Sequence, residues 1–189
     1  MWFFTILSIR TLTAPLQPKL CVGWTKEVAS TAPLINKVQK FWDCHPQAYN
    51  QFLEKSSIAV ARLIQSFERN NDSLAVFGLL ENRKALLRLA ERAGITIETT
   101  KLKDLCSIAE QYGSGKVSGA GSGDYGIASV KREDQIEKLF AAWLEKDINP
   151  LKVTISKTGI SITEYNCEPS LEEYFSYSYL KKNSTTVCF

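Results

Sequence analysis

The most informative stretch of this 189-residue chain is Gly113–Gly126, which reads GSGKVSGAGSGDYG. It contains six of the ten glycines in the chain. Glycine tolerates positive φ angles and lets backbone N–H groups approach a ligand, because no Cβ stands in the way. Lysine, hydroxyl and aspartate side chains among the glycines favour a phosphate-bearing ligand. The alternative is a flexible linker, which the interruptions at Lys116 and Asp124 and the strand-like run that follows make less attractive.

Two common phosphate-binding motifs do not fit this stretch. Gly115-Lys116 would end a P-loop only with glycine in place of Glu110 and Ser or Thr in place of Val117. Residues 121–126 match G-x-G-x-x-G, but that fingerprint must follow a strand and open a helix. Here the glycines run into YGIASV at 125–130, which is typical of a strand.

The run KVSGAGSGD at 116–124, followed by GIA at 126–128, resembles the third conserved motif of the GHMP kinases. Within that superfamily it is most similar to bacterial phosphomevalonate kinases. Two positions depart from their pattern, since Ser122 replaces a glycine and Tyr125 replaces a cysteine. Neither change removes a backbone donor, although Ser122 would crowd a nucleotide phosphate if its position required an unusual φ angle.

Further segments resemble the same family over about residues 12–165. VGWT at 22–25 followed by AST at 29–31 resembles a family segment, with Val28 where proline is usual. Asn82-Arg83 and the segment IET at 97–99 also look like family positions. The resemblance implies an α+β fold, the ferredoxin-like C-terminal domain of a GHMP kinase, with a small antiparallel sheet and packed helices. It places this domain at 19–167, after an inter-lobe remnant at 1–18 and before a tail of unknown role at 168–189.

The function that the resemblance implies is ATP-dependent phosphorylation of 5-phosphomevalonate to 5-diphosphomevalonate, with Mg²⁺, in the mevalonate route to isopentenyl diphosphate. Ser118 and Ala120 would approach the phosphomevalonate, as would Ser30. The predicted nucleotide-phosphate loop consists of Lys116, Gly119, Gly121, Ser122, Gly123 and Asp124. No catalytic residue and no protein-built metal site are identified from the sequence.

Three of these positions keep alternative interpretations. Lys116 either faces a phosphate or makes a surface contact. Asp124 acts through magnesium or water, or it bonds the N–H groups of its own loop. Ser30 lies at a predicted helix N-terminus, which favours an anion, so it contacts the substrate or is a plain N-cap, with Thr31 as the other cap.

GHMP kinases are bilobal, and the ATP-binding segment P-x-x-x-G-L-[GS]-S-S-A of their N-terminal lobe does not occur here. The family also has a catalytic aspartate in the region corresponding to residues 2–6, which read WFFTI. We therefore expect a C-terminal lobe that is inactive as an isolated chain and either self-associates or binds a separate N-terminal lobe. The alternative is a non-catalytic remnant, or a phosphate-ligand-binding module with the same fold.

Composition excludes several other classes of protein. The apolar content of 44% is ordinary for a globular domain, and a net charge of +3 with scattered cations gives no support for nucleic-acid binding. Five dispersed cysteines and a single histidine do not suit a zinc site and indicate free thiols in a reducing cytoplasm. The apolar run at 1–7 is too short to span a membrane.

Periodicity predicts the order of the elements. Strands are expected at 19–25 and 125–130, with a hairpin at 152–156 and 160–165. Helices are expected after residue 30, after Pro46, between a turn and cap at 70–73 and a close at Gly94, from 102 to 112 and around 136–144. His45 is interpreted as a capping or surface residue. Trp24, Trp42 and Trp143 are predicted to lie in the core.

Overall fold

The computed structural model describes residues 20–153. Contacts divide the chain into two units, 1–153 and 154–189, and all described residues belong to the first. Four strands form one sheet in the order β2-β3-β1-β4, and every neighbouring pair is antiparallel. The strands are β1 (Leu20–Trp24), β2 (Gly113–Val117), β3 (Tyr125–Val130) and β4 (Asn149–Leu151).

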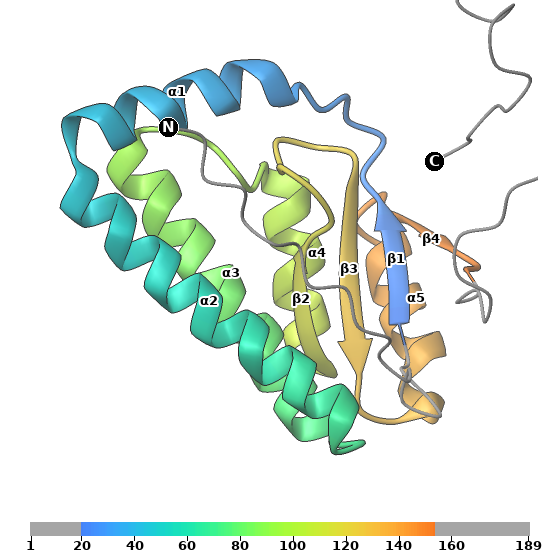
Figure 1. The fold of residues 1–189 in the computed structure, drawn as a ribbon. Helices are drawn as coiled ribbons and strands as arrows, with labels where there is room; N and C mark the ends of the chain where they lie inside the picture. Colours follow the sequence, from blue (N-terminus) through green and yellow to red (C-terminus); the bar gives the residue numbers. More distant parts are fainter. Residues whose placement is uncertain (1–19, 154–189) are drawn as a thin grey trace, which may run out of the picture. The chain divides into compact units, whose positions relative to one another are not determined.

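Two helices, α4 (Thr100–Glu110) and α5 (Ile136–Leu144), provide the helical side of the main core (Figure 1). Leu105 and Cys106 of α4 and Trp143 of α5 pack with Cys21 and Ala128 of the sheet, and all are buried. The indole Nε1 of Trp143 donates to the carbonyl of Leu105 at 3.1 Å, so the one polar atom of this side chain is satisfied. Strand, helix, two strands, helix and strand in this order form the ferredoxin-like arrangement.

Three further helices are inserted between β1 and α4: α1 (Thr31–Cys44), α2 (Pro46–Glu68) and α3 (Asp72–Ala93). Asn71 caps α3 by accepting from the N–H of Leu74 at 3.0 Å, and Gly94 ends it in the left-handed conformation. A smaller cluster joins α3 to the start of α4 and to β2 through Ala90, Ile97, Leu102 and Val117. In Figure 1 α2 lies against α3 on the side of α3 away from the sheet. A short 3₁₀ turn, Glu133–Gln135, precedes α5.

The sequence predicted most element positions, and strand 125–130 is confirmed at both ends. The structure differs from the prediction in the glycine-rich stretch, because the first five residues of this stretch form strand β2 and are not part of a loop. A Cβ on Gly113 would lie 2.0 Å from the carbonyl oxygen of Ser129, and one on Gly115 would lie 2.8 Å from the Cα of Cys106. These two glycines therefore allow close packing of backbone against β3 and α4.

Two of the three tryptophans predicted in the core are not buried. Trp143 is fully buried, whereas Trp24 is 36% exposed and Trp42 is 45% exposed. Trp24 lies against Tyr125 and Trp42 stacks on Tyr49, so each keeps one aromatic neighbour. His45 links α1 to α2, and its ring tilts against Phe41 at 5.2 Å, as expected for a capping residue.

The last predicted strands fall at the edge of the described region. The strand after α5 is Asn149–Leu151 and ends before Lys152, so the predicted start at Lys152 is wrong. The rest of the predicted hairpin, and the domain boundaries at 18/19 and 167/168, lie outside the described residues. Within 20–153, none of the helices is long and apolar enough to cross a bilayer.

Candidate functional site

The candidate site is centred on the loop from Ser118 to Asp124, which connects β2 to β3. Because Trp24 pairs with Tyr125, this loop lies at the same end of the sheet as the end of β1 (Figure 1). Its second half has a rare backbone, with φ angles of +84° at Gly121, +67° at Ser122, +131° at Gly123 and +65° at Asp124. Four successive positive φ angles curl the chain sharply, and two of them are borne by residues other than glycine.

Backbone hydrogen bonds fix the loop at three positions. The N–H of Ser118 donates to the carbonyl of Tyr125 at 3.0 Å, and the N–H of Ser122 donates to that of Ile97 at 2.7 Å. The N–H of Asp124 donates to the carbonyl of Glu27 at 2.9 Å. The loop is therefore held to two other segments of the chain, one after β1 and one before α4.

The N–H groups between these anchors remain available. Among the described residues, no hydrogen bond involves the N–H of Gly119, Ala120, Gly121 or Gly123. Gly119 and Ala120 are exposed, so their N–H groups, unpaired within residues 20–153, face solvent, whereas Gly121 and Gly123 are buried. Neighbouring unpaired backbone donors in a curled loop form a concavity that suits an anion.

The glycines in the loop differ in what they tolerate. A Cβ on Gly121 would lie 2.2 Å from the carbonyl oxygen of Ile97, so glycine is required there for packing as well as for its φ angle. Around Gly119 no heavy atom lies within 4 Å of such a Cβ. Ser122 does adopt an unusual φ, but its Oγ donates to the carbonyl of Thr96 at 2.9 Å. The hydroxyl that departs from the family pattern is thus bonded to the segment before α4.

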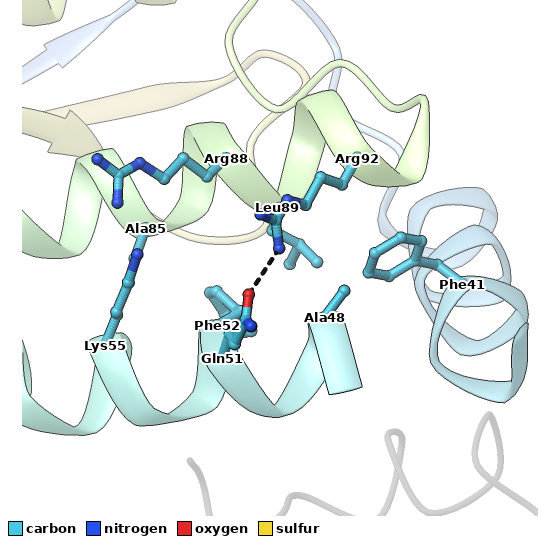
Figure 2. A pocket seen from close by; sticks show the side chains of 9 residues that line it. All are labelled: Phe41, Ala48, Gln51, Phe52, Lys55, Ala85, Arg88, Leu89 and Arg92. Carbon is cyan, nitrogen blue, oxygen red and sulfur yellow. Dashed lines mark hydrogen bonds between the residues drawn. The ribbon is translucent and has the colours of Figure 1, made fainter. Parts of the chain in front are cut away.

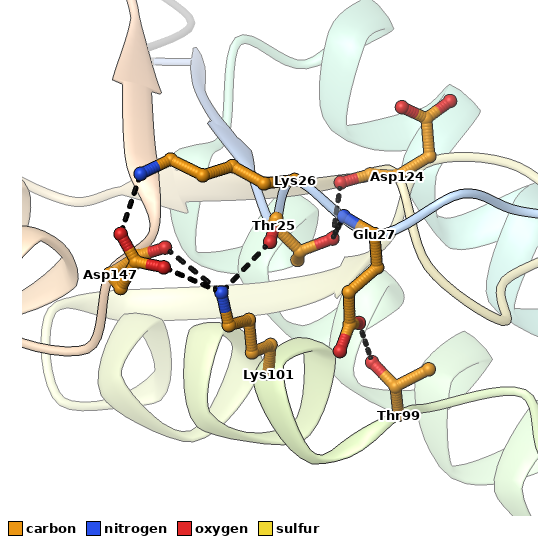
Figure 3. Close-up of polar contacts among 7 residues, drawn as sticks. All are labelled: Thr25, Lys26, Glu27, Thr99, Lys101, Asp124 and Asp147. Atoms are coloured by element: carbon orange, nitrogen blue, oxygen red, sulfur yellow. Dashed lines mark hydrogen bonds and ion pairs between the residues drawn. The ribbon is translucent and has the colours of Figure 1, made fainter.

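Asp124 holds the loop through its backbone. Its carbonyl accepts from both the N–H and the Oγ1 of Thr25, at 2.8 and 2.9 Å. In Figure 3 its carboxylate points away from the other labelled side chains, and no hydrogen bond to it is found within residues 20–153. The predicted bonds from this carboxylate to the N–H groups of its own loop are therefore not formed, which leaves the side chain free for another partner.

Lys116 and Ser30, the other two predicted site residues, lie in different settings. Lys116 is in β2, and its Nζ donates to the carbonyl of Val117 at 2.8 Å. Burial lowers the pKa of this ammonium from its ordinary value. Ser30 is the N-cap of α1, with its backbone extended and without a capping bond from its side chain, so its exposed hydroxyl is not committed to the helix.

A buried ion pair holds the segment before α4, to which the loop is hydrogen-bonded. Arg83 of α3 binds Glu98 in a bidentate manner, with Nε and Nη2 each 2.7 Å from a carboxylate oxygen, and Nη1 bonds Glu110. Only 5% of the Glu98 side chain is exposed. Glu98 directly follows Ile97, whose carbonyl accepts the loop N–H of Ser122. The resemblance singled out Arg83 and Glu98 separately, and the structure brings them together.

Sequence reasoning missed a second group of charges (Figure 3). Asp147, after α5, binds Lys26 at 2.5 Å and Lys101 at 2.8 Å. Lys101 also donates to the carbonyl of Thr25 at 3.2 Å, next to the contact between Thr25 and the loop. The hydrogen bond from Lys101, followed by that from Lys26, lowers the pKa of Asp147 to about 2. No local pattern links these positions, because residues 26 and 147 meet only through the pairing of β1 with β4.

The segment between β1 and α1 is tied to α4 by one more contact. Thr99 caps α4 by accepting from the N–H of Leu102 at 3.3 Å, and its hydroxyl donates to the carboxylate of Glu27. Glu27 is the residue whose carbonyl holds Asp124. Among the described residues, no cluster of three or more His, Cys, Asp or Glu could hold a metal ion by itself. A cation at this site would therefore need oxygen ligands from a bound molecule.

Comparison with known proteins agrees with this fold. Residues 59–149 match the family model of the GHMP kinases C terminal. The described residues form a four-stranded antiparallel sheet with packed helices, and this part of the chain is a GHMP kinase C-terminal domain.

Individual proteins similar to the chain include phosphomevalonate kinases. The chain is 34% identical over 156 residues to the phosphomevalonate kinase of Streptomyces sp. (strain CL190), covering 81% of this chain and 42% of that enzyme. A crystal structure of a protein from Listeria innocua is 36% identical with a TM-score of 0.74, covering 77% of this chain and 41% of that one.

The phosphomevalonate kinase of Streptococcus pneumoniae, solved in complex with phosphomevalonate and AMPPNP, is 25% identical with a TM-score of 0.64. The match covers 77% of this chain and 41% of that enzyme. The chain thus spans about two fifths of the length of the relatives that it matches.

Proposed function

We propose that this chain is the C-terminal lobe of a phosphomevalonate kinase, which transfers the γ-phosphoryl group of ATP to a phosphate oxygen of 5-phosphomevalonate. The products are 5-diphosphomevalonate and ADP, in the mevalonate route to isopentenyl diphosphate. The observation that carries the proposal is the loop at 118–124, which three backbone bonds hold in place while the N–H groups of Gly119 and Ala120 stay exposed and without a partner among residues 20–153. The 34% identity to a phosphomevalonate kinase supports the choice of acceptor.

The roles follow from what phosphoryl transfer needs, which is positioning and neutralisation of charge. The N–H groups of Gly119, Gly121 and Gly123 would bind phosphate oxygens, while Ser118 and Ala120 would approach the phosphomevalonate. Ser30 would offer a free hydroxyl and the N-terminal end of α1 to the phosphate of the substrate. Lys116 would supply a cation once its bond to the Val117 carbonyl is exchanged for a phosphate.

Magnesium would enter with ATP as a bound ion that neutralises phosphate charge. Mg²⁺ is usually held by one or two carboxylates together with substrate phosphates and waters. The carboxylate of Asp124 suits this chemistry because it has no partner among residues 20–153 and stands at the end of the loop. We place the reaction in the cytoplasm, where thiols such as Cys21 and Cys106 stay reduced.

We expect residues 1–189 alone to be inactive, and either to self-associate or to bind an N-terminal lobe that is supplied separately. It aligns with only 42% of its curated relative, so most of that enzyme has no counterpart here. Exposed apolar residues near the candidate site, Trp24 and Val28, would suit an interface with such a lobe.

The test is ADP release with ATP, Mg²⁺ and 5-phosphomevalonate, measured for the chain alone and mixed with an N-terminal lobe from a related phosphomevalonate kinase. We expect turnover only in the mixture. Gly119→Asp should abolish it by placing a carboxylate among the loop donors, whereas Gly119→Ala fits the open space there and should retain it. Turnover that is unchanged in Gly119→Asp would contradict the role of the loop. Lack of turnover in every sample, with phosphomevalonate still bound, would favour a phosphate-ligand-binding module.

A further inference from the structure

We propose that the groove between α2 and α3 is a second anion site, separate from the glycine loop, which takes a compact multivalent anion of the diphosphate class. The groove consists of two adjoining hollows that share Lys55, Ala85 and Arg88. The larger hollow, of about 200 Å³, is also lined by Arg62, Lys84, Glu81 and Ile58. The smaller one, drawn in Figure 2, adds Arg92 and contains no acidic residue in its lining.

The positive charge of this groove is not neutralised within the described part of the chain. Glu81 is the one acid among the lining residues, and Lys84 already binds it at 3.0 Å. Arg62 lies over the ring of Phe77, at 4.9 Å from its centroid. Within residues 20–153, Lys55 and Arg88 take part in no ion pair. The excess of cations contrasts with a net charge of only +3 for the whole chain.

Small residues leave room for a ligand between the two helices. Ala59 and Ala85 are buried where α2 faces α3. Gly78 brings the helices close together, since a Cβ there would lie 3.0 Å from the carbonyl oxygen of Ala59. The groove is therefore lined by long basic side chains together with apolar residues such as Ala85, Leu89 and Ile58. Figure 2 shows Lys55 pointing from α2 toward α3, while Arg92 of α3 reaches α2 and donates to Oε1 of Gln51 at 3.0 Å.

The spacing of the cations indicates an anion larger than a single phosphate. Lys55 and Arg62 are two turns apart on α2, about 10 Å along the axis, and Lys84 and Arg88 are about 6 Å apart on α3. Guanidinium groups bind phosphoryl oxygens in a bidentate manner, and ammonium groups add point charges. Two linked phosphoryl groups could engage both helices at once. The site does not depend on the proposed kinase function, because no residue of the loop at 118–124 lines the groove.

The experiment titrates inorganic diphosphate into the ¹⁵N-labelled full chain and follows amide chemical shifts by NMR, in parallel with calorimetry. The groove variant is Lys55→Met together with Arg88→Met, and the matched control is Lys138→Met together with Lys146→Met, which removes two exposed lysines elsewhere. Gly119→Asp blocks the loop, so that binding there cannot be mistaken for binding in the groove. Inorganic phosphate and citrate, each titrated separately, test the choice of a diphosphate over a single phosphate or a tricarboxylate.

We expect diphosphate to shift amides around Lys55 and Arg88 in the wild type, in the lysine control and in Gly119→Asp. The groove variant should bind at least tenfold more weakly, and phosphate should bind more weakly than diphosphate in every protein that retains the groove. Binding that disappears only in Gly119→Asp would overturn the proposal, as would binding that is equal in the groove variant and the control. Absence of any shift in this groove at millimolar diphosphate would also overturn it. Stronger binding of citrate would replace the diphosphate class by carboxylates.

Discussion

At the scale of single residues, the loop keeps an unfavourable backbone because each strained position has a compensating contact. Ser122 and Asp124 adopt left-handed φ angles, which cost about 1–2 kcal/mol per residue when glycine is not used. Ser122 donates hydrogen bonds to the carbonyls of Thr96 and Ile97. The N–H of Asp124 donates to the carbonyl of Glu27, and the carbonyl of Asp124 accepts from the N–H of Thr25. Strain that the surroundings hold in place is a common property of ligand-binding loops.

Gly121→Ala should destabilise the chain by about 2 kcal/mol or more, since it combines a positive φ with a Cβ 2.2 Å from the carbonyl of Ile97. Urea unfolding followed by circular dichroism measures the change. Gly119→Ala is the matched control and should stay within about 1 kcal/mol of the wild type, because its Cβ meets no heavy atom. Equal stability of the two variants would mean that the loop does not pack as described.

Asp147 gives a prediction of pH dependence. The bonds from Lys101 and Lys26 lower its pKa from 3.8 to about 2 in the folded chain. The stabilisation from this depressed pKa is complete above about pH 4 and is lost as the pH falls through about 2. Thermal unfolding of wild type and Asp147→Asn between pH 5 and pH 2 should therefore give melting temperatures that converge toward the acid end. A constant difference across this range would contradict the two ion pairs.

At the scale of elements, the pair Arg83–Glu98 joins α3 to the segment that precedes α4 and holds the loop. Arg83→Met should cost about 3–5 kcal/mol, because it leaves the carboxylate of Glu98 buried without its partner. The double variant Arg83→Met with Glu98→Leu should recover most of this loss, since both charges are then absent. A double-mutant cycle in urea measures the coupling. A double variant less stable than Arg83→Met would contradict this account.

The sequence predicted those elements whose signals are local. The turn and cap at 70–73, the helix end at Gly94 and the strand at 125–130 are set by neighbouring residues, and each is confirmed, with Asn71 as the N-cap. The exposure of Trp24 and Trp42 was not predictable, because aromatic residues signal burial without indicating which face of an element is covered. The strand at 113–117 was not predicted, because glycine is not a strand signal. Here Gly113 and Gly115 lack a side chain so that the backbone can pack closely against β3 and α4. The contacts of Asp147 arise only from strand pairing, and composition cannot encode them.

At the scale of the whole molecule, one core covers the sheet and contains two thiols. Burial raises the pKa of Cys21 to about 11 and that of Cys106 to about 12, so both stay protonated and unreactive at neutral pH. Iodoacetamide at pH 8 should modify the exposed Cys44 at least tenfold faster than either of them, as measured by mass spectrometry of peptides. In urea that unfolds the chain, all three should react at similar rates. Fast modification of Cys106 in the native chain would show that the core opens readily.

The central position of β1 has a consequence for the order of folding during synthesis. Among residues 20–153 β1 is the earliest strand, yet it lies between β3 and β4, and its partner Ser129 is about 110 residues away from Leu20. At about 5–20 residues per second, a ribosome needs roughly 5–20 s to make the segment between them. During that interval β1 exposes both edges, while α1, α2 and α3 can already form from local contacts. The nascent chain therefore passes through a stage with its helices formed and its sheet absent, which is when a chaperone would be most useful.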